Sequence, residues 1–360
     1  MKHGRLHRIA VMCAAAVALA SACLDLEVEN TNAADRAAAL ANPSDVQLLV
    51  TGAYRQWWTV AHGHEPAGAL STAADAHSST SDRSGQFESG REPRRALDNS
   101  PVGATSFIAP VNVRPWAISY VGLASVRDGL LAIEEGLRIV VEGEDHTERV
   151  VAFGKFVQAL TLANLAVLYD RAFIVDETVD DFAALEVQSY TAMWAAAEHK
   201  FAEVIEMASG ADFTIPSEWV GHNGDWSADY LAEVARAYWT RYRTQVPRNP
   251  AERDALDWEA IRREAMAGLS RDFAGRWVRG QWPAYHISKL TYACCSFVRM
   301  DYRTIGPADA SGQWEAWINA PVDERTPFLI DTDDRRITGA SPTTDGRYMA
   351  YVGNSPFPPE

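Results

Sequence analysis

Apolar residues recur at helical spacing along most of the chain between residues 44 and 269. They line one face in each of six segments, which we predict to be helices: one that begins at Ser44, and five at 115–138, 148–170, 190–208, 227–243 and 257–269. Ser44 and Gln47 have the spacing of a capping box, so Ser44 is the expected N-cap of the first helix. The pattern indicates a mostly α fold.

The segment 148–170 has the strongest pattern and is apolar on two sides, so it is expected to pack between neighbours. It forms a predicted helical hairpin with 190–208, and 227–243 forms a second one with 257–269. Two consecutive hairpins predict a tetratricopeptide-like scaffold, although the chain shows no clean 34-residue period.

The same patterns place several individual side chains. Trp194 and Trp258 lie on apolar stripes and are expected in the core, whereas Glu203 is expected to point away from it. Trp57 and Trp58 are adjacent on one helix, so only one of them is expected to face the core. The other is expected at an edge or under a long loop.

Long irregular segments interrupt the helical pattern. Residues 61–115 show no periodicity, and the part at 71–90 is dense in Ser, Thr, Asp and Gly. An irregular stretch of this length in a globular chain is usually functional surface rather than linker. Helical spacing fades again after Gly275, and residues 339–360 end without a predicted helix.

The N-terminus carries an export pattern. Three basic residues precede an apolar run at 9–22, which is too short to span a bilayer and has the length of a signal-peptide core. Small residues then stand directly before Cys23, an arrangement that resembles a bacterial lipobox. We therefore predict that residues 1–22 are a signal peptide, that Cys23 is acylated, and that 23–43 are an acidic tether. The alternative is an ordinary cleaved signal with an incidental cysteine.

Charge narrows the possible partners. Removal of Lys2, Arg5 and Arg8 with the signal takes the formal net charge from −15 to −18. A chain with this negative charge repels nucleic acid and an anionic membrane leaflet. Its attachment to the membrane is therefore expected to depend on the lipid carried by Cys23. No second apolar run is expected to reach membrane-spanning length. Cys294 and Cys295 are adjacent and are interpreted as buried apolar side chains rather than a structural disulfide.

No catalytic or metal-binding signature is found. His64 and Glu65 lack the second histidine of a zinc protease motif, and no glycine-rich nucleotide or hydrolase motif occurs. Paired acids occur at 134–135, 180–181 and 331–334, but a chain with 48 acidic residues contains such pairs by composition alone. We predict a protein that is not an enzyme, without metal or cofactor.

Three aromatic residues in an irregular segment are the candidate ligand-binding residues: Trp277, Trp282 and Tyr285. Flat rings in exposed loops can stack on the apolar faces of sugars, which would make an oligosaccharide the ligand. On this hypothesis Trp282→Ala loses affinity without losing thermal stability. The alternative is that these rings fill the gap between loop and helices, because large aromatic residues dominate protein cores.

Several short motifs occur in a characteristic order, and together they resemble the SusD/RagB family of outer-membrane nutrient-binding lipoproteins. The resemblance covers most of residues 23–337. The motifs are the Cys23 lipobox, the helix Asp45-Val-Gln-Leu-Leu-Val-Thr-Gly-Ala-Tyr54, Arg114-Pro-Trp116 with Tyr120, the long helix ending Leu-Ala-Val-Leu-Tyr169-Asp170, Asp257-Trp258, and Asp333-Asp-Arg-Arg-Ile337.

The resemblance implies non-enzymatic capture of a nutrient at the cell surface. The lipid-anchored protein would bind an oligosaccharide or other nutrient and deliver it to a SusC-like, TonB-dependent transporter of the outer membrane. The family's closing helices have no counterpart here, so residues 44–360 are expected to be a truncated or naturally short SusD-like domain. Two other hypotheses remain, an envelope glycoside hydrolase and a tetratricopeptide-like protein–protein adaptor.

Overall fold

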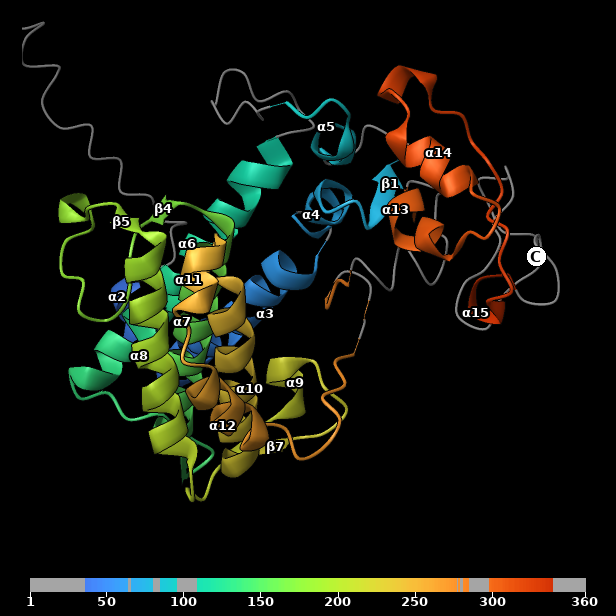
Figure 1. The fold of residues 1–360 in the computed structure, drawn as a ribbon. Helices are drawn as coiled ribbons and strands as arrows, with labels where there is room; N and C mark the ends of the chain where they lie inside the picture. The colour runs from blue at the N-terminus through green and yellow to red at the C-terminus, as the bar shows by residue number, and fades with distance from the viewer. Residues whose placement is uncertain are drawn as a thin grey trace, which may run out of the picture. The chain divides into compact units, whose positions relative to one another are not determined.

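The computed structural model describes residues 36–63, 66–79, 85–95, 109–276, 278, 281–284 and 298–338. Within this part the fold is mostly helical, as predicted (Figure 1). Residues 1–39 and 40–360 form two separate units, and everything below except the first residues of α2 (Arg36–Leu40) belongs to the second. Cys23, the tether before residue 36 and the cysteines at 294 and 295 lie outside the described residues.

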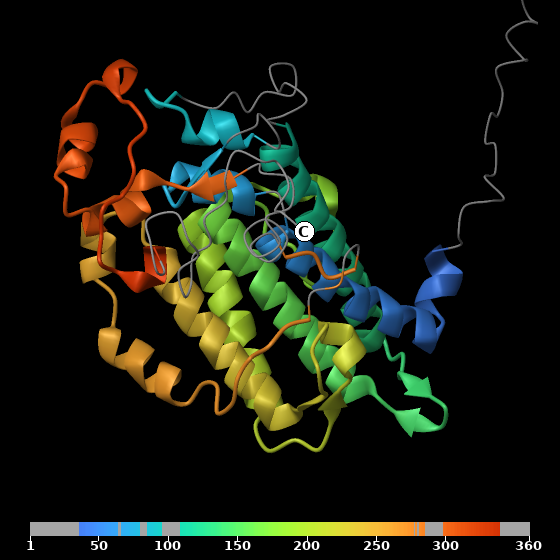
Figure 2. The same cartoon turned by 90° about the vertical axis from the view of Figure 1, so that its right-hand side faces the viewer.

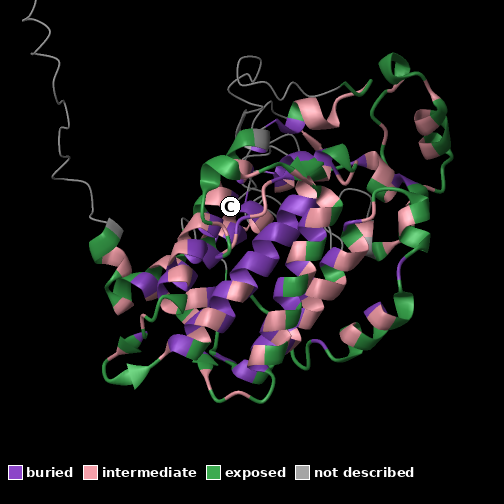
Figure 3. Cartoon of the chain, turned by 90° about the vertical axis from the view of Figure 1, so that its left-hand side faces the viewer, coloured by how far each residue is buried: buried purple, intermediate pink, exposed green. Residues whose placement is uncertain are grey.

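Long helices form the body of the second unit (Figures 1 and 2). Helix α7 (Thr147–Leu168) contacts the four other long helices, and 16 of its 22 residues are buried. The prediction that this helix packs between neighbours is confirmed, and Figure 3 shows buried residues concentrated along the long helices. The long helices are α3 (Pro43–His62), α6 (Ala109–Glu134), α7 (Thr147–Leu168), α8 (Tyr190–Ala208) and α10 (Ala228–Gln245).

Shorter elements connect and follow the long helices. The short helices are α4 (Ala67–Ala73), α5 (Gln86–Gly90), α9 (Ser217–Val220), α11 (Pro250–Asp254), α12 (Trp258–Met266), α13 (Tyr302–Ile305), α14 (Gln313–Asn319) and α15 (Arg335–Thr338), with 3-10 turns at Phe182–Ala184, Gly306–Ala308 and Val322–Glu324. The irregular segment after α3 therefore contains two helices and a strand that its composition did not predict.

The described strands pair as four antiparallel two-stranded ladders. Three join neighbours in sequence, whereas β1 pairs with β8 across more than 200 residues, His77 opposite Met300. The pairs are β1 (His77–Ser79) with β8 (Val298–Met300), β2 (Val140–Val141) with β3 (Glu144–Asp145), β4 (Arg171–Ala172) with β5 (Gln188–Ser189), and β6 (Thr214–Ile215) with β7 (Trp226–Ser227).

Short polar side chains begin three helices at the predicted places. Ser189, Ser227 and Asp257 are the N-caps of α8, α10 and α12, and each accepts a hydrogen bond from the backbone N–H three residues later. Such a bond satisfies one of the unpaired donors of the first turn. The predicted starts of these helices are confirmed.

The first helix begins differently from the prediction. The N-cap of α3 is Asn42, whose side chain accepts a hydrogen bond from the backbone N–H of Ser44 at 3.0 Å. Pro43 is the first helical residue, a position where its missing N–H costs nothing. Ser44 is therefore inside the helix, and the capping-box assignment is wrong.

Helix α6 starts earlier and ends earlier than predicted. It begins at Ala109 and includes Pro115 in its second turn. There the proline removes a single backbone hydrogen bond, so the helix continues. Its end is set by Gly136, whose φ of +110° allows backbone bonds to the last turn, before Arg138 is reached.

Helix α12 exposes residues that its pattern placed in the core. Ile261 is buried, but Trp258 is 49% exposed. The helix ends at Met266, earlier than predicted, so Leu269 lies beyond it and is exposed as well. The only long helix in the described part of the chain with extensive contacts to α12 is α10, so only one side of α12 is covered. The core prediction is confirmed for Trp194, which is 4% exposed, and wrong for Trp258.

By length and composition alone, two of the described helices are long and apolar enough to cross a membrane. They are the part of α6 at Val113–Glu134 and the whole of α7. The expectation that no second run reaches this length is therefore wrong. The apolar window of α7 is 89% buried inside the protein, which is typical of the core helix of a globular domain.

A buried ion cluster joins α7 and α8 to the segment that follows β4. Lys200 Nζ donates to Glu177 Oε1 at 2.8 Å, and Lys155 donates to both Glu177 and Glu203. Asp176 lies 3.3 Å from Lys200. Burial alone would raise the pKa of Glu177, but the hydrogen bonds from both lysines lower it to about 2. Glu203, predicted to point away from the core, is part of this cluster.

Candidate ligand pocket

The structure places Trp282 in the core rather than on an exposed loop. Its side chain is packed so that the residue is only 8% exposed. The ring centroid lies 5.7 Å from that of Trp58 and 6.1 Å from that of Tyr54. The premise that Trp282 is an exposed stacking surface is therefore wrong, and the gap-filling alternative describes its position. Trp277 and Tyr285 lie outside the described residues.

Glycines allow this segment to approach the helices. A Cβ on Gly221 would lie 2.5 Å from the Trp282 ring, and Gly221 has a φ of +63° as well. A Cβ on Gly275 would lie 2.5 Å from Trp58. Gly275 and Pro283 both approach Trp58, whose Nε1 donates to Pro283 O at 2.8 Å, and both Trp57 and Trp58 are buried. Both rings belong to the core cluster, so the expectation that only one of them faces the core is wrong, but Trp58 does lie under an irregular segment.

His222 is part of the same aromatic cluster. Its ring lies 4.3 Å from Phe273 and 5.0 Å from Trp226, and the residue is 5% exposed. Burial, with a smaller effect of the nearby Arg271 charge, lowers the pKa of His222 to about 4. The folded protein therefore holds this imidazole neutral at physiological pH.

The buried His222 predicts a loss of stability in mild acid. Its pKa is lower in the folded state than the usual 6.5, so the unfolded state binds the proton first and stability falls as pH decreases from about 6.5 to about 4. The full loss is on the order of 3 kcal/mol. Chemical denaturation of His222→Phe should show a flatter dependence over this range, and the exposed His199→Gln is the matched control. An unchanged slope in His222→Phe would contradict the prediction.

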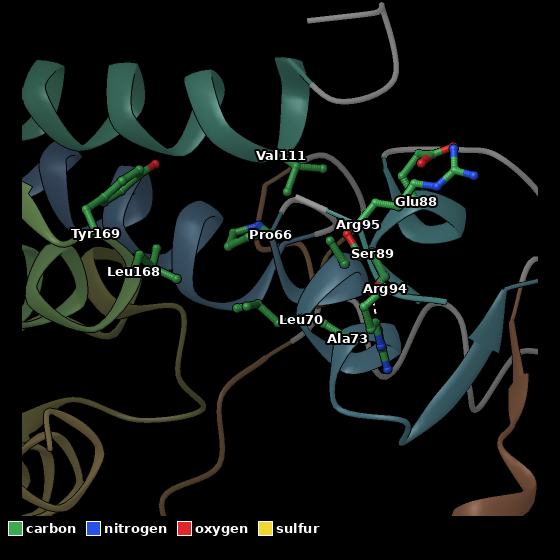
Figure 4. Close-up of a pocket in the computed structure, with 11 residues that line it drawn as sticks. Pro66, Leu70, Ala73, Glu88, Ser89, Arg94, Arg95, Val111, Leu168 and Tyr169 are labelled. Atoms are coloured by element: carbon green, nitrogen blue, oxygen red, sulfur yellow. Dashed lines mark hydrogen bonds between the residues drawn. The ribbon is translucent and has the colours of Figure 1, made fainter. Parts of the chain in front are cut away.

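A pocket of about 350 Å³ opens elsewhere, where the ends of α6 and α7 meet the segment 66–95 (Figure 4). Most of its lining is apolar, and the charged groups gather on the side formed by residues 88–95. The apolar lining is Pro66, Ala69, Leu70, Ala73, Val111 and Leu168, and the other lining residues are Tyr169, Glu88, Ser89, Arg94 and Arg95.

Contacts with Arg248 and with Trp116 stabilise the wall of the pocket that the end of α7 forms. Arg248 donates hydrogen bonds to the carbonyl oxygens of Ala166 and Tyr169, at 3.1 and 2.7 Å, and so caps the helix C-terminus. The Tyr169 ring packs edge-on against Trp116 at 5.1 Å, and its hydroxyl is hydrogen-bonded to the Trp116 backbone. Burial raises the pKa of Tyr169 to about 12, so the hydroxyl stays protonated.

The opposite wall is tied to the C-terminal part of the chain. Arg94 pairs with Asp75 at 2.5 Å and also donates to the Ser89 carbonyl. Glu92 pairs with both Arg303 and Arg325. Together with the β1–β8 ladder, these contacts attach residues 75–79 and 92–94 to residues 298–325. The pocket therefore has two walls that are fixed independently.

The charges on the rim do not cancel. Glu88 is paired with Arg91 at 3.0 Å, and Arg94 is paired with Asp75. Arg95 is exposed and makes no hydrogen bond or ion pair with any described residue. The guanidinium of Arg95 is therefore a positive charge without a described counter-charge, next to the mostly apolar lining of the pocket.

The described lining offers few groups for acid–base or metal chemistry. The lining contains a single carboxylate, Glu88, whereas glycoside hydrolysis needs two across a cleft. The described residues also include no group of three or more His, Cys, Asp or Glu side chains that could hold a metal ion, so the acids at 331–334 do not form one.

Sequence reasoning identified the region of this pocket but not its residues. The irregular segment 61–115 was predicted to be functional surface, and nine of the lining residues come from it. The basic run Arg91-Glu-Pro-Arg94-Arg95 was the available signal, because three arginines in five residues stand out in an acidic chain. The contribution of Leu168 and Tyr169 could not be read from any local pattern.

No family model matches the chain, and no curated protein or solved structure matches it significantly. The resemblance to the SusD/RagB family therefore stays a prediction.

Proposed function

We propose that this protein is a non-enzymatic, lipid-anchored binding protein that captures a nutrient and delivers it to a SusC-like, TonB-dependent transporter of the outer membrane. The observation that carries the proposal is the pocket between the helical body and the segment 66–95. Its walls are fixed and mostly apolar, and it lies where sequence reasoning expected a functional surface. Pockets of this size and character are typical of small-molecule binding sites.

The arrangement of the long helices supports the finer fold assignment. Helix α7 packs on α8, α8 on α10, and α10 on α12, in chain order. We propose that these are two tetratricopeptide-like hairpins stacked in a SusD-like scaffold, with acylated Cys23 holding the protein at the cell surface. A rigid helical body of this kind presents a ligand to a partner without taking part in chemistry.

Obstruction of the pocket tests the function. Ala73 is exposed and lines the pocket, so Ala73→Trp should fill its mouth while leaving the fold intact. Ala74 is also exposed but does not line the pocket, so Ala74→Trp is the matched control. We expect Ala73→Trp to lose at least tenfold in affinity for the bound nutrient by isothermal titration calorimetry, with the control unchanged.

The same experiment separates the alternatives. A panel of oligosaccharides and small organic acids is titrated into the full chain, and each mixture is then analysed for cleavage products. Hydrolysis would replace the proposal with the glycoside hydrolase. Binding of proteins only, unaffected by Ala73→Trp, would replace it with the adaptor.

A further inference from the structure

The lining of the pocket fits one class of ligand better than a neutral sugar. A glycan needs many hydrogen-bonding groups, but six of the lining side chains are aliphatic, and the ring of Tyr169 in the lining already packs against Trp116. Trp282, the ring expected to stack on a sugar, is buried elsewhere in the core. The charged groups lie on one side of the pocket only, so a complementary ligand is apolar at one end and charged at the other.

We infer that the pocket binds a medium-chain aliphatic carboxylate, with the chain against Leu70, Val111 and Leu168 and the carboxylate at Arg95. The inference rests on the proposed binding function and names its ligand class. In Figure 4 Val111 extends from α6 above Pro66, Leu168 and Tyr169 close one end, and Arg95 lies at the other. The apolar and charged parts of the ligand therefore have separate places.

Size sets the length of the chain. A volume of about 350 Å³ equals that of roughly twelve water molecules in the liquid, at ~30 Å³ each. Decanoate, with ten carbons and two oxygens, is therefore a probe of comparable size. Leu70 is 51% exposed, an unusual position for a large apolar residue, and an aliphatic chain in the pocket would cover it.

Among the described residues of the lining, Arg95 is the cation that remains for the carboxylate. Arg94 is already bonded to Asp75 and to the Ser89 carbonyl, and Glu88 is neutralised by Arg91. The rest of the chain is strongly acidic, so its overall field does not attract an anion. The preference for a carboxylate must therefore come from this one guanidinium, which can bond both carboxylate oxygens.

The test compares decanoate with decanol, which has the same chain and no charge. Both are titrated into the full chain carrying Cys23→Ser, which cannot be acylated and needs no detergent. We expect Arg95→Gln to weaken decanoate binding about fivefold, the upper range for an exposed ion pair, and to leave decanol binding unchanged. Arg263→Gln, an exposed arginine on α12, should change neither. Ala73→Trp should weaken both ligands at least tenfold.

Each outcome decides a separate point. Equal effects of Arg95→Gln on decanoate and decanol would overturn the role of Arg95. Decanoate binding that survives Ala73→Trp would place the ligand outside this pocket and overturn the inference. If decanoate does not bind while another nutrient binds and is lost in Ala73→Trp, the ligand class is wrong and the proposed function stands. If no ligand responds to Ala73→Trp, both are overturned.

Discussion

Trp282→Ala is expected to lower the free energy of unfolding by about 4 kcal/mol, the usual range for removing a buried tryptophan. The ring fills the space between Tyr54, Trp58 and Gly221, and the residue is 8% exposed. Alanine would leave a cavity that the helices cannot close, because α3 is held by its own packing on α6 and α7. Denaturant unfolding followed by tryptophan fluorescence measures the change.

A matched substitution on the surface is the control for this prediction. Trp258 is 49% exposed on α12, so Trp258→Ala removes the same side chain from a position that is only partly covered. We expect it to cost about 1 kcal/mol or less. Similar losses in the two variants would contradict the burial of Trp282. The expected loss of stability in Trp282→Ala is the opposite of what an exposed binding residue would show. A variant of such a residue would lose affinity and keep its thermal stability.

Lys200→Met is expected to destabilise the protein by about 3 to 5 kcal/mol, because removing one partner leaves buried carboxylates without compensation. The Lys200 side chain is 5% exposed and the Glu177 side chain 4%. Methionine has a similar length and fits an apolar surround, so packing changes little. Urea denaturation at neutral pH gives the difference directly.

Two comparisons identify charge as the cause. Arg262 forms an exposed ion pair with Glu259, and Arg262→Met should cost less than about 0.5 kcal/mol. The double variant Lys200→Met with Glu177→Gln should lose less than the sum of the single variants, since the two groups compensate each other. Additive losses would show that the pair does not interact.

Because the pKa of Glu177 is about 2, below its usual value, the stability that this carboxylate contributes is present above pH 4.5 and is lost as pH falls toward 2.

Local spacing predicted the helices well where their caps are also local. Tyr190–Ala208 was predicted to the residue, and Ser227 and Asp257 were found at the starts of the next two helices. A helix end depends on a few hydrogen bonds within one turn, so neighbouring residues suffice to predict it. The first helix shows where this reasoning fails. Asn42 and Ser44 are both good N-caps, and Pro43 decides between them.

Patterns of apolar residues were less informative about burial. Trp258 was expected in the core and is half exposed, whereas Trp282 was expected on an exposed loop and is buried. The reason is that an apolar face is buried only where another element covers it. Gly275 and Pro283 approach Trp58 and Trp282 packs beside it in the core, whereas the described contacts of α12 leave Trp258 half exposed. Charge patterning failed for the same reason at Glu203, which two lysines from α7 and α8 bring into a buried cluster.

The sequence by itself determined that this chain is mostly helical and that α7 is a core helix. Those properties follow from spacing and composition within single segments. The tertiary structure alone decided which tryptophans are buried, where the charges pair, and where a pocket exists. The physical reason is that the pocket needs Leu168 and Tyr169, Val111 and residues 66–95 to meet. Contacts between segments so far apart in the chain leave no mark on the local pattern of any one of them.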